Sequence, residues 1–186
     1  PADRIDAADL VDFEPSLRPG LAGAFHYPGD ASVRPELLNE QWSARLRDRG
    51  VEFIEQCELR GPRKESGRIT AVETSHGEME ADRYVVATGA WSPRLSSALE
   101  CRIPIEAGKG YSLTTSRPEP SPRHPMLLPE RKVGVSIFEG GCRLGSMMEF
   151  VGYDSSIPAA RLQYLRDSAA NYLAGPISGE NHHTWY

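Results

Sequence analysis

The chain has 186 residues, of which 39% are hydrophobic and 25% charged, and its net charge is −5, from 21 basic and 26 acidic side chains. These values are typical of a folded globular protein, and the acidic balance argues against nucleic acid or an anionic membrane as a general partner. No apolar run approaches the roughly 20 residues of a membrane-spanning helix, and residues 1–4 lack the features of a signal peptide. We therefore expect a cytoplasmic protein without a transmembrane segment.

The first half of the chain is predicted to contain one helix and several short strands. Residues 1–33 are rich in Pro, Gly and Asp, which predicts an extended lead-in with one short helical turn. A helix follows, because Pro35 suits a first helical position and Gly50 suits the residue after the last turn. One face of this helix carries an apolar stripe, formed by Leu38, Trp42 and Leu46.

Extended segments follow this helix. We expect a strand at residues 51–55, and a hairpin of two strands at 68–74 and 78–81 around a turn at His76-Gly77. Residues 60–64, Arg-Gly-Pro-Arg-Lys, are interrupted by Gly and Pro and are predicted to form a solvated loop.

The most informative segment is residues 81–92, Ala-Asp-Arg-Tyr-Val-Val-Ala-Thr-Gly-Ala-Trp-Ser. The apolar run at 84–87 is typical of a strand buried on both faces in a parallel sheet. Thr88 and Gly89 would then lie at the carboxyl end of the strand, where open α/β sheets bind ligands. Gly89 has no Cβ, so its backbone can approach a cofactor closely or adopt a positive φ. The alternative is an ordinary core strand followed by a turn.

The second half is predicted to form a mostly antiparallel sheet. Its strands are expected at residues 103–105, 110–115, 126–128, 132–138 and 142–150, with a hairpin connection at 139–141. Residues 116–125 contain four prolines and are predicted to form a surface loop.

A second helix is predicted to cover this sheet. Pro158 suits its start, Ser155 or Ser156 its N-cap, and Gly175-Pro176 its end. Its apolar face is formed by Leu162, Leu165, Ala169, Tyr172 and Leu173.

The cysteines and histidines do not form a metal-binding pattern. Cys57, Cys101 and Cys142 are odd in number and widely spaced, so we expect reduced thiols that are buried or half-buried. The histidine pair at 182–183 has only Glu180 nearby as a further ligand, so no metal site is predicted.

Four short segments, in order along the chain, carry a resemblance to one enzyme family. They are residues 33–38 with 49–53, 67–74 with 81–92, 103–105 with 108–114, and 143–145 with Glu149, 152–154 and Arg161. The chain resembles the FAD-dependent D-amino acid oxidase superfamily. The string Lys-Gly-Tyr-Ser-Leu-Thr at 109–114 favours its D-amino acid dehydrogenase branch, with glycine oxidase next.

The resemblance implies a mixed α/β and α+β fold, with a partial, Rossmann-like FAD-binding portion and a mostly antiparallel substrate-domain sheet under a covering helix. By position, residues 1–33 form a lead-in, 34–98 the partial FAD-binding domain, and 99–186 an incomplete substrate-binding domain.

The resemblance also implies a reaction and a set of contacts. An amino acid substrate loses its α-hydrogen as hydride to FAD, and the resulting imine hydrolyses to a keto acid. No protein residue is assigned as catalytic, because the cofactor performs the difficult step. The implied FAD contacts are Leu59, Ala87, Thr88, Gly89, Ala90 and Trp91, and the implied substrate contacts are Tyr111 and Met148.

Each of these assignments has a simpler structural alternative. Leu59 suits a plain strand end, Trp91 and Tyr111 suit core positions, and Met148 suits a gap in a core. Lys109 is expected to be a solvated lysine rather than the partner of a carboxylate.

The chain departs from the family pattern in three places. It contains no GxGxxG turn, whose amides bind the FAD pyrophosphate in the family. The family's Arg-Pro segment, which holds the substrate carboxylate, would begin where Trp185-Tyr186 stand. A pocket tyrosine near residues 132–136 is replaced by Val or Gly, which leaves the substrate open. We therefore expect the middle portion of a flavoenzyme, inactive and weak in FAD binding by itself.

Two other functions remain open at the level of sequence. One is a non-catalytic α+β binding or assembly module, and the other is a flavoenzyme that oxidises glycine or sarcosine-type amines. The sequence decides neither the oligomeric state nor the choice between oxygen and a quinone as electron acceptor. A quinone acceptor would imply peripheral contact with the inner membrane.

Overall fold

The computed structural model describes residues 1–177 and 183–185 and contains two compact units. The first unit comprises residues 1–35 and 109–186, and the second comprises residues 36–108. The boundaries expected from the sequence, after residues 33 and 98, do not coincide with this division. The assignment of functional domains stays a prediction.

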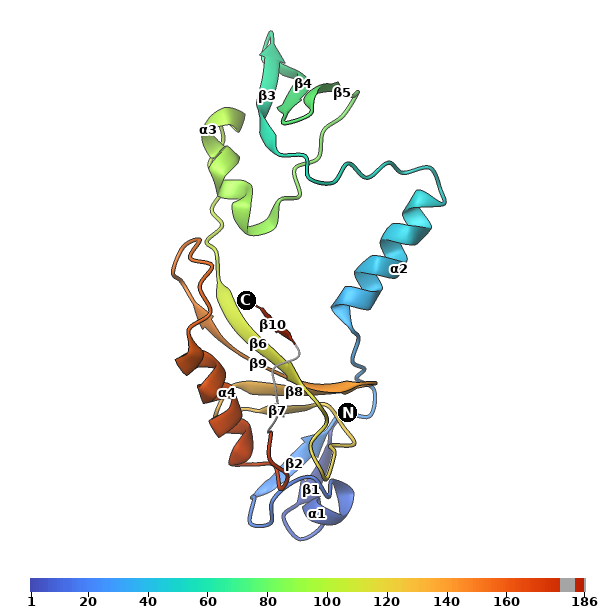
Figure 1. The fold of residues 1–186 in the computed structure, drawn as a ribbon, viewed down its shortest axis with the longest axis vertical. Helices are drawn as coiled ribbons and strands as arrows, with labels where there is room; N and C mark the ends of the chain where they lie inside the picture. The colour runs from blue at the N-terminus through green and yellow to red at the C-terminus, as the bar shows by residue number, and fades with distance from the viewer. Residues whose placement is uncertain (178–182, 186) are drawn as a thin grey trace. The chain divides into compact units, whose positions relative to one another are not determined.

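The first unit is built on a five-stranded sheet with the strand order β10-β6-β9-β8-β7 (Figure 1). All of its strand pairs are antiparallel. The strands are β6 (Lys109–Thr115), β7 (Met126–Leu128), β8 (Val133–Phe138), β9 (Gly141–Glu149) and β10 (His183–Trp185). The sequence predictions for β6 to β9 are therefore confirmed, whereas β10 was not expected. Residues 103–105 form no strand.

One face of this sheet packs against helix α4 (Ala159–Ala170), as Figure 1 shows. Alternate residues of the strands point into this core, because successive side chains of a strand lie on opposite faces. They are Tyr111, Leu113, Val133, Val135, Cys142 and Leu144. The predicted apolar face of α4 is confirmed in part: Leu165 and Ala169 are fully buried, whereas Tyr172 and Leu173 lie beyond the end of the helix. Burying a leucine side chain contributes about 2 kcal/mol, so Leu165→Ala would weaken this layer.

Both ends of α4 differ from the prediction. The helix ends at Ala170, five residues before Gly175-Pro176. Its N-cap is Pro158, without a side-chain capping hydrogen bond, and not Ser155 or Ser156. Ser156 instead donates its backbone N–H and its hydroxyl to the carboxylate of Asp154. Those bonds stabilise a turn before the helix rather than the helix end itself.

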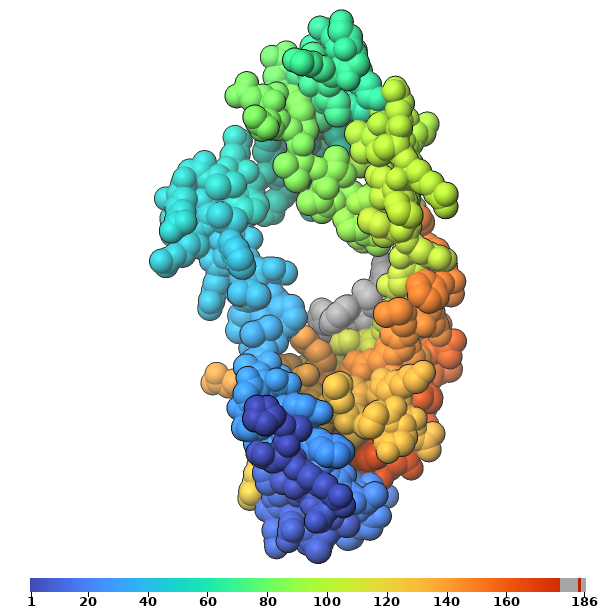
Figure 2. Space-filling model, turned by 180° about the vertical axis from the view of Figure 1, so that it is seen from behind, coloured from blue at the N-terminus to red at the C-terminus, as the bar shows by residue number. Residues whose placement is uncertain are grey.

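The N-terminal segment forms more structure than expected. It contains β1 (Asp3–Asp6) and β2 (Gly23–His26), which pair antiparallel, and one short helix, α1 (Leu10–Phe13). A Cβ at Gly23 would lie 2.6 Å from the carbonyl oxygen of Ile5, so this pairing requires glycine. Leu10 and Leu17 join the core of the first unit. The space-filling view shows this blue segment packed against the yellow residues around 120–130 (Figure 2).

The second unit contains helix α2 (Pro35–Arg47) and a three-stranded antiparallel sheet. The strands are β3 (Leu59–Glu65), β4 (Arg68–Thr74) and β5 (Gly77–Glu80). The 3₁₀ helix η1 (Gly89–Leu95) and the short helix α3 (Ser96–Leu99) follow. The predicted helix and the β4–β5 hairpin are confirmed.

The prediction of a solvated loop at residues 60–64 is wrong, because these residues belong to β3. β3 is an edge strand whose pairing with β4 is interrupted by two register shifts. Pro62 is tolerated at this edge, since proline removes a ladder donor that an edge strand can do without. Gly and Pro therefore mark an irregular strand here and not a loop.

Two other predicted strands are absent from the structure. Residues 51–55 and 84–87 form no strand, and the expected burial of 84–87 is also wrong. Val85 is 89% exposed and Val86 40% exposed. A strand exists only through hydrogen bonds to a neighbour, and among the described residues no strand pairs with either segment.

The apolar stripe of α2 is likewise uncovered within the second unit. No residue of α2 is buried, and Leu38 and Trp42 are 46% and 61% exposed. The spacing of these residues thus predicted the helix correctly, but the described residues of this unit do not bury its apolar stripe.

Candidate functional site

The turn at residues 87–91 is the first candidate site. Gly89 adopts a φ of +54°, as its position in a turn predicted, and begins η1. The backbone N–H of Trp91 donates to the carbonyl oxygen of Thr88 at 3.0 Å, and the hydroxyls of Thr88 and Ser92 lie 2.9 Å apart. No atom lies within 4 Å of a Cβ built on Gly89, so the space beside this backbone is open.

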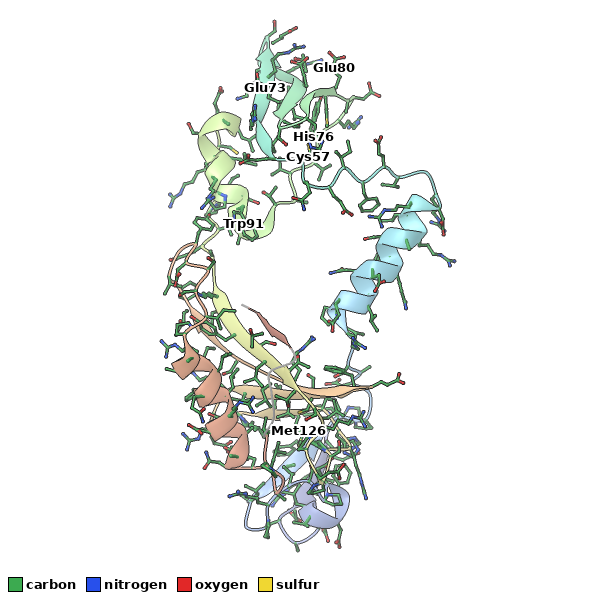
Figure 3. All side chains as sticks on the ribbon, in the orientation of Figure 1. Cys57, Glu73, His76, Glu80, Trp91 and Met126 are labelled. Carbon is green, nitrogen blue, oxygen red and sulfur yellow. The ribbon has the colours of Figure 1, made fainter. Side chains whose placement is uncertain are left out.

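The predicted FAD contacts fall into two places in the second unit. Five of them, residues 87–91, are consecutive in this turn, and Leu59 lies opposite Thr74 at the start of β3. Trp91 lies on η1 (Figure 3) and is 59% exposed, so its alternative as a core residue is excluded within this unit. The assignment of these residues to FAD stays a prediction.

The turn fits one part of an FAD site. An open, positive-φ backbone next to an exposed indole allows a large planar group to lie against it. The glycine-rich turn that would hold the pyrophosphate is absent from the sequence. These residues are therefore suited to contact the cofactor along its length and not to bind its phosphates.

A groove of about 850 Å³ on the first unit is the second candidate site. The predicted substrate residues both line it: Tyr111 is buried, and Met148 is 74% exposed. The high exposure of Met148 excludes its alternative as a filler of the core in this unit. The lining also includes residues that the sequence reasoning did not assign to a site: Gly110, Ser112, Leu127, Lys132, Gly134, Ser136, Arg143, Gly145, Ser146, Met147, Glu149, Arg161 and Tyr164.

Part of the groove, here called its floor, is the sheet face opposite α4, whereas Arg161 and Tyr164 of α4 line another part. Gly134 pairs with Gly145 in register between β8 and β9, and Gly145 pairs with Ser112 of β6. The strand alternation that sends Val133 and Val135 into the core leaves small residues on this face. Met126 of β7 packs against the core (Figure 3), whereas its neighbour Leu127 lines the groove. The alternation of Val with Gly and Ser in residues 133–136 was the available sequence signal.

An ionic network borders the groove. The hydroxyl of Tyr111 donates to Oε2 of Glu149 at 2.8 Å, and Oε1 of Glu149 pairs with Arg161 at 2.5 Å. Glu149 and Arg161 were quoted for the family resemblance but were not predicted as site residues. The arrangement fixes the tyrosine ring and places a half-exposed guanidinium at the border of the groove.

Lys109 is not the solvated lysine that was expected, because its side chain is only 4% exposed. Its ammonium lies 3.3 Å from Oδ2 of Asp154, 2.5 Å from the carbonyl oxygen of Ser156 and 5.1 Å from the ring centroid of Tyr111. Hydrogen bonds from Ser156, followed by that from Lys109, hold the pKa of the Asp154 carboxyl below its usual value. A lysine is buried at low cost when several acceptors and an aromatic face replace water.

The cysteines and the possible metal ligands are the remaining candidate groups. Cys101 is exposed, contrary to the expectation of a buried or half-buried thiol, whereas Cys57 is half-buried and Cys142 is buried. In the described ranges, no group of three or more His, Cys, Asp or Glu side chains is placed to hold a metal ion. His182 and Glu180 lie outside the described residues.

No helix in the part of the chain that the structure describes is long and apolar enough to cross a membrane.

Solved structures place this fold in a known class. The chain superposes over its whole length on glycine oxidase from Geobacillus kaustophilus, with a TM-score of 0.87 and 22% identity, and covers 50% of that chain. It superposes on L-proline dehydrogenase from P. horikoshii with a TM-score of 0.79 and 20% identity, covering 51% of that chain. The chain thus has an α+β fold of the class seen in these oxidoreductases.

Sequence comparison gives the family. The family model "DAO: FAD dependent oxidoreductase" matches residues 1–186, and the chain belongs to this family. FAD is the cofactor of that family. The chain is 30% identical over 180 residues to a D-amino acid dehydrogenase of Agrobacterium fabrum and 33% identical over 177 residues to a glycine oxidase of Pseudomonas putida. The two alignments include 94% and 93% of this chain but only 43% and 47% of the relatives. The chain therefore spans less than half of their length.

Proposed function

We propose that residues 1–186 are the central part of an FAD-dependent enzyme that oxidises the CH–NH2 group of D-amino acids. The family match over the whole chain carries this proposal. The D-amino acid dehydrogenase of Agrobacterium fabrum supports the substrate class. The open turn at Gly89 and the groove at Tyr111 offer surfaces for a planar cofactor and a small substrate.

Bound FAD would supply the acceptor for the two electrons and the hydrogen removed from the substrate carbon. The chain's own residues would orient the substrate. Arg161, which is half-exposed beside Glu149, suits an anionic substrate group at the groove. The buried ring of Tyr111, held by Glu149, would supply a rigid wall that excludes water.

The exposed apolar surface of the second unit supports the view that further chain covers it in the whole enzyme. Val85 and Val86 have the sequence of a buried strand but are exposed, as are Leu38 and Trp42 of α2. Patches of this kind mark surfaces that pack against other chain segments. We propose that residues 84–87 become a paired strand when such segments are present.

The proposal is tested on the whole protein that contains this chain. The purified protein should carry FAD, visible by its flavin absorbance, and should reduce an artificial electron acceptor with D-alanine. Absence of turnover with any D-amino acid, despite bound FAD, would refute the substrate class. Comparing oxygen with a quinone analogue as oxidant would identify the acceptor.

The separate 186-residue chain is expected to bind FAD weakly and to be inactive. This follows because it lacks a glycine-rich phosphate turn and because residues 84–87 are unpaired in the structure. Equimolar FAD on this chain together with turnover would refute this part. A chain that binds neither FAD nor an amine in any context would favour the non-catalytic module.

Glycine or a sarcosine-type amine is the second candidate substrate. The glycine oxidase of Pseudomonas putida, 33% identical over 177 residues, favours it. A screen of glycine, sarcosine and a series of D-amino acids with the whole enzyme would separate the two, through the ratio of their kcat/KM values.

A further inference from the structure

The glycines around the groove are of two kinds. A Cβ on Gly110 would lie 3.2 Å from the carbonyl oxygen of Met147, and one on Gly141 would lie 3.0 Å from the Phe138 ring, so close packing accounts for both. A Cβ on Gly134 or Gly145 would meet only ordinary contacts, at 3.6 Å and 4.0 Å, and neither residue has a positive φ. The fold therefore does not require glycine at either position.

Gly134 and Gly145 lie directly opposite each other on β8 and β9, in the floor of the groove. Any side chain at these two positions would project into the groove, because strand alternation gives them the face away from α4. Because glycine has no side chain, the space above these two adjacent backbones stays empty.

A buried hydroxyl adds a second, independent observation. Ser112 pairs with Gly145 in the same floor and is only 4% exposed. Its Oγ has no hydrogen-bond partner among the described residues. Buried hydroxyls are nearly always satisfied, so an unsatisfied one beside a groove indicates a missing polar partner.

Apolar side chains line part of the groove, beside the charged groups at its border. Leu127 and Met148 are 83% and 74% exposed, and the half-exposed ring of Tyr164 lies at the same groove. Flexible methionine and leucine side chains accommodate a planar group, and the backbone floor provides a flat surface beneath it.

We propose that the Gly134–Gly145 pair makes the groove specific for amines with a large planar side chain that carries a hydrogen-bonding atom, such as a phenol. Ser112 Oγ binds that atom, and the two glycines admit the ring. This inference rests on the proposed function, which it refines by giving the substrate class.

The main experiment uses the whole FAD-loaded enzyme and compares D-tyrosine, D-phenylalanine and D-alanine. The double variant Gly134→Ala/Gly145→Ala adds two methyl groups to the floor without a backbone clash. Its kcat/KM for the two aromatic substrates should fall by about tenfold or more, and that for D-alanine should stay within about twofold. An equal fall for all three substrates, or a wild-type preference for D-alanine, would overturn the inference.

The hydroxyl is tested separately with Ser112→Ala. This variant should lose about tenfold of the preference for D-tyrosine over D-phenylalanine and leave D-phenylalanine unchanged. An unchanged preference would refute the role of Ser112. Gly29→Ala is the matched control, because Gly29 lies outside the groove and its Cβ would meet open space. Flavin absorbance and the thermal midpoint of each variant report folding.

Equilibrium binding distinguishes failure of this inference from failure of the proposed function. Calorimetry of the same proteins with 4-hydroxyphenylacetate should show binding that the double alanine variant weakens by about tenfold, while acetate is unaffected. Such a result without turnover of any amino acid would refute the enzyme's substrate class but keep the groove's specificity. Equal binding to wild type and variant would overturn the inference even in an active enzyme.

Discussion

Tyr111 and Glu149 are joined by a 2.8 Å hydrogen bond from the phenol to the carboxylate, across neighbouring strands of the first unit. The same tyrosine ring lies 5.1 Å from the ammonium of Lys109. One aromatic side chain of the core thus contacts both Glu149 at the border of the groove and the buried Lys109.

Replacing Tyr111 by phenylalanine removes only the hydroxyl. Because Glu149 keeps its contact with Arg161, we expect the free energy of unfolding to fall by about 1 kcal/mol, measured by urea unfolding. The exposed Tyr27 offers a matched control, and Tyr27→Phe should leave stability unchanged. Equal effects of the two substitutions would show that the Tyr111–Glu149 bond contributes nothing.

Lys109 should tolerate methionine better than alanine. Its stem is buried, so Lys109→Ala leaves a cavity and should cost about 2 to 3 kcal/mol, whereas Lys109→Met fills the same volume. Asp154 is half-exposed and remains solvated in either variant, so it adds no buried unpaired charge. Chemical denaturation of both variants measures the difference. A methionine variant as unstable as the alanine variant would show that the ammonium contacts dominate.

Glu14 should make the first unit sensitive to acid. Burial would raise the pKa of this carboxyl, but hydrogen bonds from Ser16, His124 and the backbone of Arg123 and His124 together lower it below the ordinary value of 4.5. Its stabilising contribution is therefore complete above about pH 4.5 and is lost as the pH falls through the lower, folded-state pKa.

The substitution Glu14→Gln tests this dependence. At pH 7 the variant should be less stable by about 3 kcal/mol, because a buried carboxylate with several donors is replaced by a poorer acceptor. The difference from wild type, measured by urea unfolding between pH 7 and pH 3, should shrink as the pH falls. A difference that stays constant across this range would contradict the assignment. Glu139→Gln, at an exposed site, serves as the control.

The two most different thiols should react in a fixed order. Burial raises the pKa of the Cys142 thiol to about 11, against a smaller opposing effect of the Arg117 charge, whereas Cys101 is exposed. Since the thiolate is the reactive form, iodoacetamide at pH 8 should label Cys101 in the folded protein and Cys142 only after unfolding. Peptide mapping by mass spectrometry reads this directly, and early labelling of Cys142 would show that its strand opens.

Local patterns in the sequence determined the family and most of the first unit. The strands β6 to β9 were predictable because short segments with apolar residues are bounded by Gly and Pro, and α4 because its apolar residues recur at helical spacing. The positive φ at Gly89 was predictable for the same local reason. These features depend on residues close together in the chain.

Only the tertiary structure decided which groups face each other and which segments are paired. The run at 84–87 has the composition of a buried strand, yet it is exposed because pairing needs a neighbour that composition cannot supply. Lys109 is buried because Asp154 and Ser156 lie beside it, 45 and 47 residues along the chain. Gly134 and Gly145 likewise form one floor only through the register of β8 and β9, since cross-strand neighbours are set by long-range pairing and not by local sequence.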